Sequence, residues 1–334
     1  MSALHAGWYL VAFADELSDD LTPVRVGGRR MMLVRRESGL RLVDSTCPHR
    51  GADLAYGGVL KGNAVLCPFH GRRIAIGASR SPYSVREYPT FVAGPLVFAR
   101  LTAQAEGDCG FPALVSAMLE GHEIRTAVST SVDVPVDYVV ENAFDAEHFS
   151  VVHGVPSVRG MTASTHPEGY LTVDATFLTL QDPWQDPALR DYLRVTLGPG
   201  ARRMANTASG FHATAFSPTL VATVFGSGAG SSVILTGAVP TPEGTRVRVA
   251  VSGHPGAALD RVVDGAIKAI EQDVDVWAHL DPDAPSMLDE LDGPVIAFQE
   301  FCRAFPAAPL IPLPTAADST CPAELSLSGV GHGG

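Results

Sequence analysis

Two short segments, each with one cysteine and one histidine, constrain this chain more than any other feature. They read Cys47-Pro48-His49-Arg50-Gly51 and Cys67-Pro68-Phe69-His70-Gly71. Each offers one thiolate and one imidazole from a loop whose proline and glycine restrict the backbone. Two cysteines on one iron and two histidines on the other are the ligands of a Rieske [2Fe–2S] centre. The alternative is a Cys₂His₂ zinc site, although zinc fingers usually present both cysteines before both histidines.

The two segments resemble the cluster-binding loops of the Rieske iron–sulfur family. This resemblance implies that Cys47, His49, Cys67 and His70 hold a Rieske-type [2Fe–2S] cluster. Respiratory Rieske proteins carry a further cysteine in each loop, and Phe69 stands at that position in the second loop of this chain. The loops are therefore similar to the oxygenase and ferredoxin type.

Arginines take the place of an aromatic residue that oxygenases usually have after the second His-Gly pair. Arg72 and Arg73 stand there, and Arg50 lies in the first loop. We expect these arginines either to form a cationic collar beside the cluster or to bond the carbonyl groups of the loops.

A second pair of histidines, His148 and His153, lies near the end of a helix predicted over about residues 135–153. On a regular α-helix, residues five apart point about 140° away from each other, so they do not share one ion. They converge only if the helix is distorted or ends between them, and Gly154 and Pro156 provide a stop signal.

A long helix predicted over about residues 257–280 supplies an acidic residue. Its apolar stripe consists of Leu259, Val263, Ala266, Ile270, Asp273 and Trp277. Asp273 thus occupies a core position, where a carboxylate needs a metal or another cation. Two histidines and one carboxylate form the facial triad of non-haem Fe(II) oxygenases. The alternative is an Asp273 paired with a buried arginine or lysine.

These motifs resemble the catalytic domain of Rieske non-haem iron oxygenases, especially the 3-ketosteroid 9α-hydroxylase group. The pattern is Asn142-x-x-Asp145-x-x-His148-x₄-His153, followed far downstream by Glu271-Gln272-Asp273-Val274-x-x-Trp277. The resemblance implies that His148, His153 and Asp273 bind a mononuclear Fe(II). It also implies that Asp145 is a bridge, which hydrogen-bonds a ligand histidine and the cluster histidine of the neighbouring subunit, and that Asn142 lies beside the iron.

The expected fold is α+β, with two domains. Short β-rich runs from Trp8 to about Leu101 predict an all-β domain over residues 1–106. A linker is expected over 107–126, an antiparallel sheet with helices over 127–306, and a flexible tail over 307–334. The resemblance implies a helix-grip fold of the START type for the second domain. Its least recognisable part, residues 162–230, builds the substrate pocket in that family.

Composition limits the partners of the chain. The net charge is −12 and the sequence pI about 5.3, which argues against nucleic acid and anionic membranes. No apolar run reaches the length of a membrane span, and five scattered cysteines predict a cytoplasmic protein. Residues 1–105 carry 13 Lys and Arg against 8 Asp and Glu, whereas the rest carries 11 against 28. This asymmetry predicts contacts between basic and acidic domains in an oligomer, and the resemblance implies a homotrimer.

The function that the resemblance implies is the oxidation of a mostly apolar small molecule, such as a steroid or a secondary metabolite. The oxygenase would use O₂ and electrons from a separate NAD(P)H-dependent reductase or ferredoxin to hydroxylate, desaturate or demethylate it. Two alternatives are an aromatic-ring hydroxylating dioxygenase and a non-catalytic Rieske electron carrier fused to a ligand-binding domain. Five further histidines are expected to be ordinary surface or hydrogen-bonding residues: His122, His166, His212, His254 and His279. Of these, His212 lies on a candidate strand of the pocket.

Overall fold

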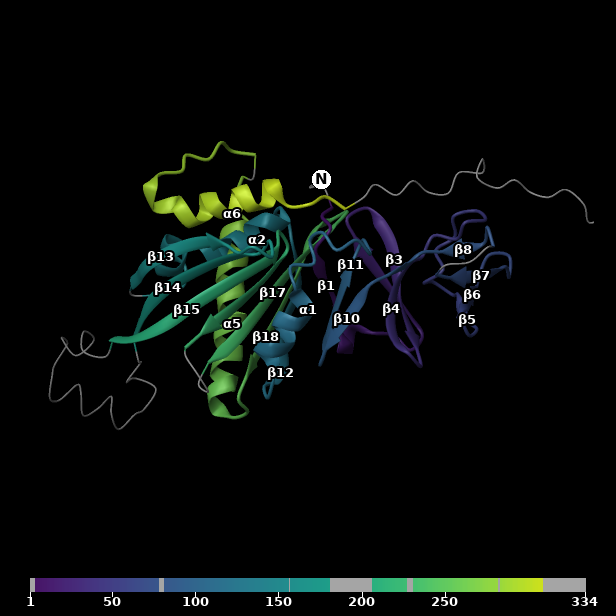
Figure 1. Cartoon of the computed structure of the whole chain (residues 1–334), viewed down its shortest axis with the longest axis horizontal. Helices are drawn as coiled ribbons and strands as arrows, with labels where there is room; N and C mark the ends of the chain where they lie inside the picture. Colours follow the sequence, from purple (N-terminus) through teal and green to yellow (C-terminus); the bar gives the residue numbers. More distant parts are fainter. Residues whose placement is uncertain are drawn as a thin grey trace, which may run out of the picture.

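The molecule consists of two β-rich parts that lie side by side along its longest axis (Figure 1). The computed structural model describes residues 4–77, 81–155, 157–180, 206–226, 231–281 and 283–308. The N-terminal part is built from strands in three small sheets, and the C-terminal part from one large sheet with helices. This arrangement confirms the predicted α+β class. None of the described helices is long and apolar enough to cross a bilayer.

The N-terminal part contains the short helix η1 (Ala14–Glu16) and the strands β1 (Trp8–Phe13), β2 (Leu21–Val26), β3 (Arg29–Arg36), β4 (Gly39–Asp44), β5 (Val59–Leu60), β6 (Ala64–Leu66), β7 (Arg73–Ile76), β8 (Ser84–Val85), β9 (Glu87–Tyr88), β10 (Thr90–Ala93) and β11 (Leu96–Arg100). These strands form three sheets, in the orders β1-β11-β10, β2-β3-β4-β9 and β5-β6-β7-β8. The third sheet forms the end of the molecule farthest from α5 (Figure 1).

The C-terminal part contains α1 (Phe111–Leu119), β12 (Glu123–Val132), α2 (Val136–Glu141), η2 (Asn142–Phe144), α3 (Ala146–Val151), β13 (Ser157–Thr165), β14 (Leu171–Leu180), β15 (Asn206–Ser217), β16 (Leu220–Phe225), β17 (Ser232–Thr241), β18 (Gly244–Gly253), α5 (Ala257–Trp277), η6 (Glu290–Asp292) and α6 (Gly293–Ala304). Its seven strands form one antiparallel sheet in the order β12-β18-β17-β16-β15-β14-β13.

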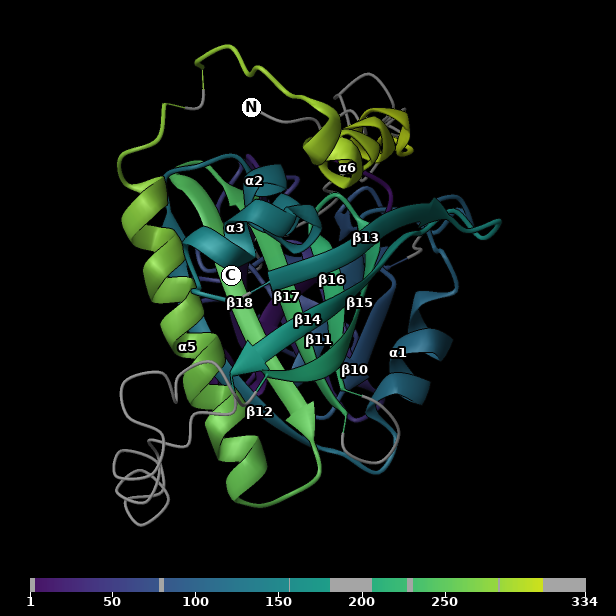
Figure 2. The same ribbon diagram turned by 90° about the vertical axis from the view of Figure 1, so that its left-hand side faces the viewer.

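Both faces of the large sheet are covered, and alternate residues of each strand serve opposite faces. Phe211 and Ala213 of β15 belong to the inner core, where α5 and the short helices pack. Phe216 of β15 and Leu220 of β16 belong to the outer core, against β1 and α1. Figure 2 shows α5 along the sheet and α3 above the same face. The inner face therefore carries the helices with the predicted metal ligands.

The two parts share the outer core, so the boundary between them is a packed interface. Trp8 and Leu10 of β1 pack with Phe111 of α1 and with Leu235 of β17. The segment 107–126, which we expected to be a linker, contains α1 and the start of β12. Its glycines and proline resemble a linker, but the apolar residues of α1 recur every four positions and form a buried helix face.

The sequence pattern predicts strands over residues 126–132, 170–180, 219–225, 232–239 and 245–251, and these are present as β12, β14, β16, β17 and β18. Strands β13 and β15 were not predicted, because small and polar residues dilute their alternation (SVRGMTAST in β13). The tail expected over 307–334 lies outside the described residues beyond Ala308. Up to that point the chain is fixed by the pairing of Ala307 with His5 and by the Ala308 N–H bond to Leu4 O.

Gly237 of β17 lies where β1 crosses the large sheet. A Cβ atom at this position would stand 2.6 Å from the Cβ of Leu10, which is the rigid base of that side chain. We expect Gly237→Ala to lower the free energy of unfolding by about 1–3 kcal/mol, because the interface between the two parts must separate to admit a methyl group. Chemical denaturation measures this change.

Gly265, on the exposed side of α5, provides the matched control. A Cβ there meets no atom within 4 Å. Gly265→Ala should stabilise the helix by about 0.5–1 kcal/mol. Equal stability of the wild type and Gly237→Ala would contradict close packing between β1 and β17.

Candidate metal centres

The two cysteine–histidine loops have the same backbone structure. The first follows β4, and the second joins β6 to β7. In each loop the cysteine N–H donates to the carbonyl five residues later, and the cysteine carbonyl accepts from the glycine N–H four residues later. In the first loop, Cys47 N–H donates to Ala52 O at 2.8 Å and Gly51 N–H to Cys47 O at 2.9 Å. In the second, Cys67 N–H donates to Arg72 O at 2.8 Å and Gly71 N–H to Cys67 O at 2.9 Å. Gly51 and Gly71 have φ angles of +72° and +65°, which glycine adopts most readily.

The loops bring their donor groups together in two pairs. Cys47 and Cys67 are 2% and 3% exposed, whereas the imidazole of His70 reaches the surface. The rings of His49 and His70 lie 4.7 Å apart between centroids at 73° to each other. Burial and the adjoining Cys67 thiol raise the pKa of Cys47, so its thiolate form needs a cation beside it.

One buried atom of this site has no hydrogen-bond partner among the described residues. His49 Nδ1 is buried and makes no hydrogen bond. Desolvation lowers the pKa of His49, and the charges of Arg72, His70 and Arg50 lower it further. The imidazole is therefore neutral and can bind a metal. Paired sulfurs at one end and paired imidazoles at the other therefore fit a [2Fe–2S] cluster of the Rieske type.

A single zinc ion fits this arrangement less well. Ligands of a tetrahedral zinc site lie about 3.3–3.8 Å from one another, given bonds of about 2.0–2.3 Å. In the part of the chain that the structure describes, His148, His153 and Asp273 form the one group of three or more such residues whose ligand atoms lie close enough to share an ion. The four residues of the cysteine–histidine loops form no such group there.

The arginines near the loops make contacts of two kinds. Arg50 lies over the ring of Phe69 at 5.7 Å, and Arg72 lies over that of Tyr83 at 4.6 Å. Arg73 instead bonds the carbonyl of Lys61 at 3.4 Å. The first loop is held by Arg30, which donates to Gly51 O at 3.1 Å and which sequence analysis did not single out.

The predicted helix over 135–153 is broken into α2, η2 and α3, and this break creates the second site. Asp145 is the N-cap of α3: its backbone is extended, and its Oδ1 accepts the His148 N–H at 2.9 Å. Helix α3 ends at Val151, so His153 lies beyond it, before Gly154 with a φ of +66°. The helix therefore ends between the two histidines, as their convergence requires.

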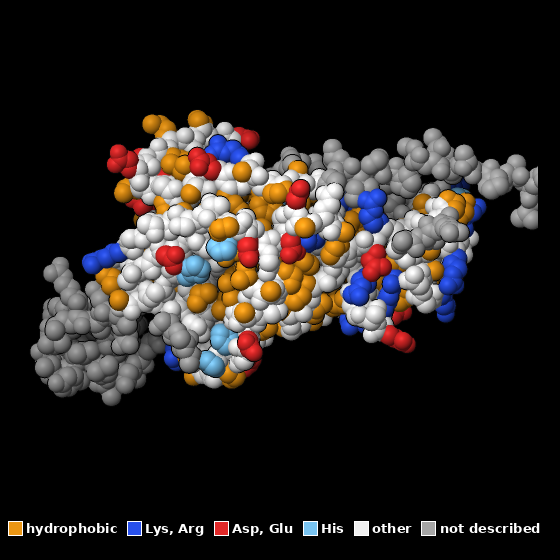
Figure 3. Space-filling model, viewed as in Figure 1, with side chains coloured by type: hydrophobic (Ala, Val, Ile, Leu, Met, Phe, Trp, Pro, Cys, Tyr) orange, Lys and Arg blue, Asp and Glu red, His pale blue; other side chains and the backbone are white. Residues whose placement is uncertain are grey.

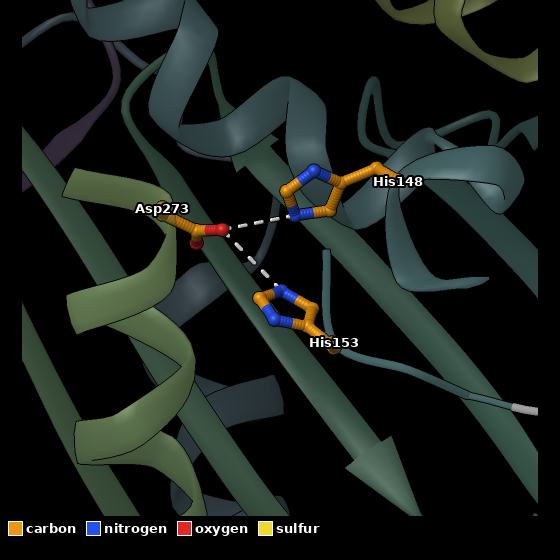
Figure 4. A group of neighbouring side chains, drawn as sticks. All are labelled: His148, His153 and Asp273. Atoms are coloured by element: carbon orange, nitrogen blue, oxygen red, sulfur yellow. Dashed lines mark ion pairs between the residues drawn. The ribbon is translucent and has the colours of Figure 1, made fainter. Parts of the chain in front are cut away.

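His148, His153 and Asp273 point toward one another in Figure 4. Asp273 Oδ1 lies 3.1 Å from His148 Nε2 and 3.4 Å from His153 Nε2. Asp273 is only 5% exposed and shares the buried face of α5 with Leu259, Ala266 and Trp277, as its position in the apolar stripe predicted. Among the described residues, the ion pairs of Asp273 are with these histidines and not with an arginine or lysine.

The arrangement of these donor atoms suits a shared metal ion better than hydrogen bonds among the three residues. His148 Nε2 and Asp273 Oδ1 are buried, and neither makes a hydrogen bond despite their short separation. The rings of His148 and His153 are 4.7 Å apart between centroids at 89°. The three ligand atoms lie within 4.8 Å of one another, so one ion could be held by all three residues.

A glutamine next to Asp273 orients the second histidine. Gln272 Oε1 lies 3.2 Å from His153 Nδ1, so the ring donates there and leaves Nε2 for the ion. Burial lowers the pKa of His153, which keeps the imidazole neutral. Gln272 stands inside the sequence motif, but only the structure reveals its contact.

Aromatic side chains border the site on the inner face of the sheet. Phe149 packs against His153 at 6.0 Å, Phe177 at 4.8 Å and Phe211 at 5.2 Å between ring centroids. Phe177 and Phe211 stack on each other at 4.4 Å and are 2% exposed. The surroundings of the site are therefore apolar on this side.

Two other predicted residues have different surroundings. Asn142 lies in η2, and its Nδ2 is buried with no hydrogen-bond partner. His212 does not face the pocket side. It bonds Asp174 at 2.7 Å and Thr214 at 3.1 Å on the outer face of the sheet, because it alternates with the inner-face residues Phe211 and Ala213.

Family profiles match both parts of the chain. The Rieske [2Fe-2S] domain matches residues 7–83, and the 3-ketosteroid 9alpha-hydroxylase C-terminal domain matches residues 116–305, more than half of the chain. The chain belongs to the Rieske oxygenase family. The resemblance read from the motifs is thereby confirmed.

Known relatives of this Rieske oxygenase include aminopyrrolnitrin oxygenase PrnD of Pseudomonas fluorescens, which is 23% identical over 90% of this chain and 91% of its own. Cholesterol 7-desaturase of Hemicentrotus pulcherrimus is 43% identical over 67 residues, 20% of this chain and 14% of that protein. The chain spans only 14% to 16% of three such desaturases. The structure of NdmA from Pseudomonas putida CBB5 with caffeine has a TM-score of 0.67 and 16% identity, covering 89% of this chain and 90% of that one, and supports the fold.

Gln272 provides a test of the second site that does not require turnover. We expect Gln272→Leu to weaken the affinity for Fe(II) or Co(II) about 10–100-fold, because the imidazole of His153 loses the acceptor that orients it. Metal titration of the protein with an intact cluster measures the affinity. Glu271→Gln, an exposed change next to it, should leave the affinity unchanged. Equal affinities for the wild type and Gln272→Leu would refute the orienting role.

Proposed function

We propose that this chain is the oxygenase component of a Rieske non-haem iron monooxygenase. It would hydroxylate, desaturate or demethylate a mostly apolar small molecule with O₂ and electrons from a separate reductase or ferredoxin. One observation carries the proposal: two imidazole nitrogens and a buried carboxylate oxygen converge without hydrogen bonds between them. The full-length similarity to aminopyrrolnitrin oxygenase supports the reaction class.

The residues of the second site would hold Fe(II) through His148, His153 and Asp273. When bound, the iron supplies O₂ activation and the [2Fe–2S] cluster supplies single electrons. Three protein ligands leave positions open on the metal, and the apolar wall of Phe149, Phe177 and Phe211 is the surface on which an apolar substrate would rest. Gln272 keeps Nε2 of His153 directed at the ion throughout.

Electrons would reach this site from another subunit. The sheet β5–β8, which carries the second cysteine–histidine loop, lies at the end of the molecule away from α5 (Figure 1). Asp145 uses Oδ1 to cap α3, which leaves Oδ2 for a donor from a neighbouring chain. Lys and Arg side chains gather over the N-terminal part (Figure 3), and the remainder of the chain is acidic. These features support a homotrimer, and the scarcity of cysteine supports a cytoplasmic location.

Asp145→Asn tests this electron route. Asparagine is as good an N-cap as aspartate, so α3 and His148 should stay in place while the charge is lost. We expect three irons per chain, as in the wild type, but at least about tenfold slower oxidation of the reduced cluster by O₂, with 3-ketosteroids or cholesterol as probe substrates. Such a loss corresponds to one charge-assisted hydrogen bond of about 1.5–3 kcal/mol.

The same measurements discriminate between the alternative functions. A non-catalytic electron carrier needs only the two cluster irons, so a wild-type content of two would exclude the oxygenase. Wild-type rates in Asp145→Asn would remove Asp145 from the route. Two atoms of ¹⁸O from ¹⁸O₂ in one product molecule would indicate a ring dioxygenase. Asp145→Ala is a poorer variant, because loss of the cap costs about 1 kcal/mol and displaces His148.

The proposed trimer should depend on salt. Opposite charges on two domains attract over about 10 Å at 0.1 M salt but only about 3 Å at 1 M. Analytical ultracentrifugation should therefore find trimers at about 0.05 M NaCl and smaller species at about 1 M. A monomer at low salt would argue against association through these surfaces.

A further inference from the structure

A third histidine pair, outside the two centres described above, lies at one end of the large sheet. His122 stands between α1 and β12, and His254 directly follows β18. Their rings are 5.2 Å apart between centroids at 70°. His254 is exposed and His122 is half-buried, so both imidazoles are within reach of solvent ions.

The sheet itself fixes the separation of these two residues. β12 and β18 are antiparallel neighbours, and Glu123 pairs with Gly253 at the end of the ladder. His122 and His254 occupy the next register position outward, so they face each other as a cross-strand pair does. By alternation they share a face with Ile124 and Ala250, which contact the outer core. This is the face of the sheet opposite Asp273.

The geometry resembles that of the other two histidine pairs of the chain. His49 with His70 and His148 with His153 both have ring centroids 4.7 Å apart and steep interplanar angles. The 5.2 Å between the centroids of His122 and His254 is only slightly longer, so an ion placed between the two rings could reach a nitrogen of each with bonds of about 2.0–2.1 Å.

A hydrogen bond orients His122 much as Gln272 orients His153. His122 Nδ1 lies 3.1 Å from the hydroxyl of Ser252, a residue with no exposed surface. A ring that donates through Nδ1 presents the lone pair of Nε2, which is the form that binds a metal ion. Burial and then His254 lower the pKa of His122, which favours this neutral form.

We propose that His122 and His254 form a third metal site, which binds one Zn²⁺ or a similar divalent transition ion through two imidazoles, with water as the remaining ligands. The site joins the α1–β12 turn to the β18–α5 connection. A bound ion therefore fastens the start of α5, the helix that carries Asp273 near its other end. This proposal is independent of the oxygenase reaction, because none of its residues belongs to the two centres described above.

Zinc titration of the holoprotein, with its cluster and its mononuclear iron in place, tests the proposal. Isothermal calorimetry with Zn²⁺ alone should detect one site per chain in the wild type. His122→Gln and His254→Gln should each weaken that site at least about tenfold, since one imidazole remains. Each variant should also lose the rise in Tm that Zn²⁺ gives the wild type.

His279→Gln is the matched control. His279 is an exposed histidine just after α5, and its Nδ1 bonds Asp275 O at 2.9 Å. This variant should bind Zn²⁺ like the wild type, and all variants should keep their iron. An anomalous-scattering peak between His122 and His254 would support the site directly. Unchanged zinc binding in both glutamine variants, or zinc uptake that only displaces the iron, would overturn it.

Discussion

The buried carboxylate of Asp273 is the constraint on which the C-terminal part depends. A charge at 5% exposure on the core face of α5 is costly unless a cation meets it. Among the described residues, the chain meets this need with two histidines rather than a lysine or an arginine, and a metal ion bound to them would place a positive charge beside the carboxylate. The interruption of the helix after Phe144, the cap at Asp145 and the end of α3 at Val151 all follow from bringing these imidazoles to Asp273.

The large sheet separates two tasks by using its two faces differently. The inner face carries the aromatic wall and the helices around Asp273. The outer face is closed by β1, α1 and their neighbours, so the N-terminal part is attached through a hydrophobic core instead of a flexible joint. Glu16 adds a polar contact, since its carboxylate accepts from Arg248 of β18 at 2.8 Å. Such an attachment fixes where the cluster loops stand relative to the sheet, which is what electron transfer between defined partners requires.

The features that residue spacing encodes could be predicted from the sequence, whereas those that depend on contacts between distant residues could not. The repeated loops and the position of Asp273 in an apolar stripe are local patterns, and both are present in the structure. The linker prediction failed because glycines flank α1 and conceal its buried face. His212 is an ordinary hydrogen-bonding histidine, as expected, and it lies on the face opposite Phe211 and Ala213 because neighbouring residues of a strand point to opposite faces. Arg30, Gln272 and Tyr83 could not be found from sequence, because their partners lie far along the chain or across a loop.

Three elements of ordinary secondary structure bring imidazoles to nearly the same separation in this chain. Matched turns do so for His49 and His70, an interrupted helix for His148 and His153, and an antiparallel ladder for His122 and His254. The differences lie in what surrounds each pair. Buried thiols accompany the first and a buried carboxylate the second, whereas the contact that the described residues show for the third is with a serine hydroxyl. Negative ligands stabilise a bound cation most, so the first two pairs suit resident metals and the third suits an exchangeable ion.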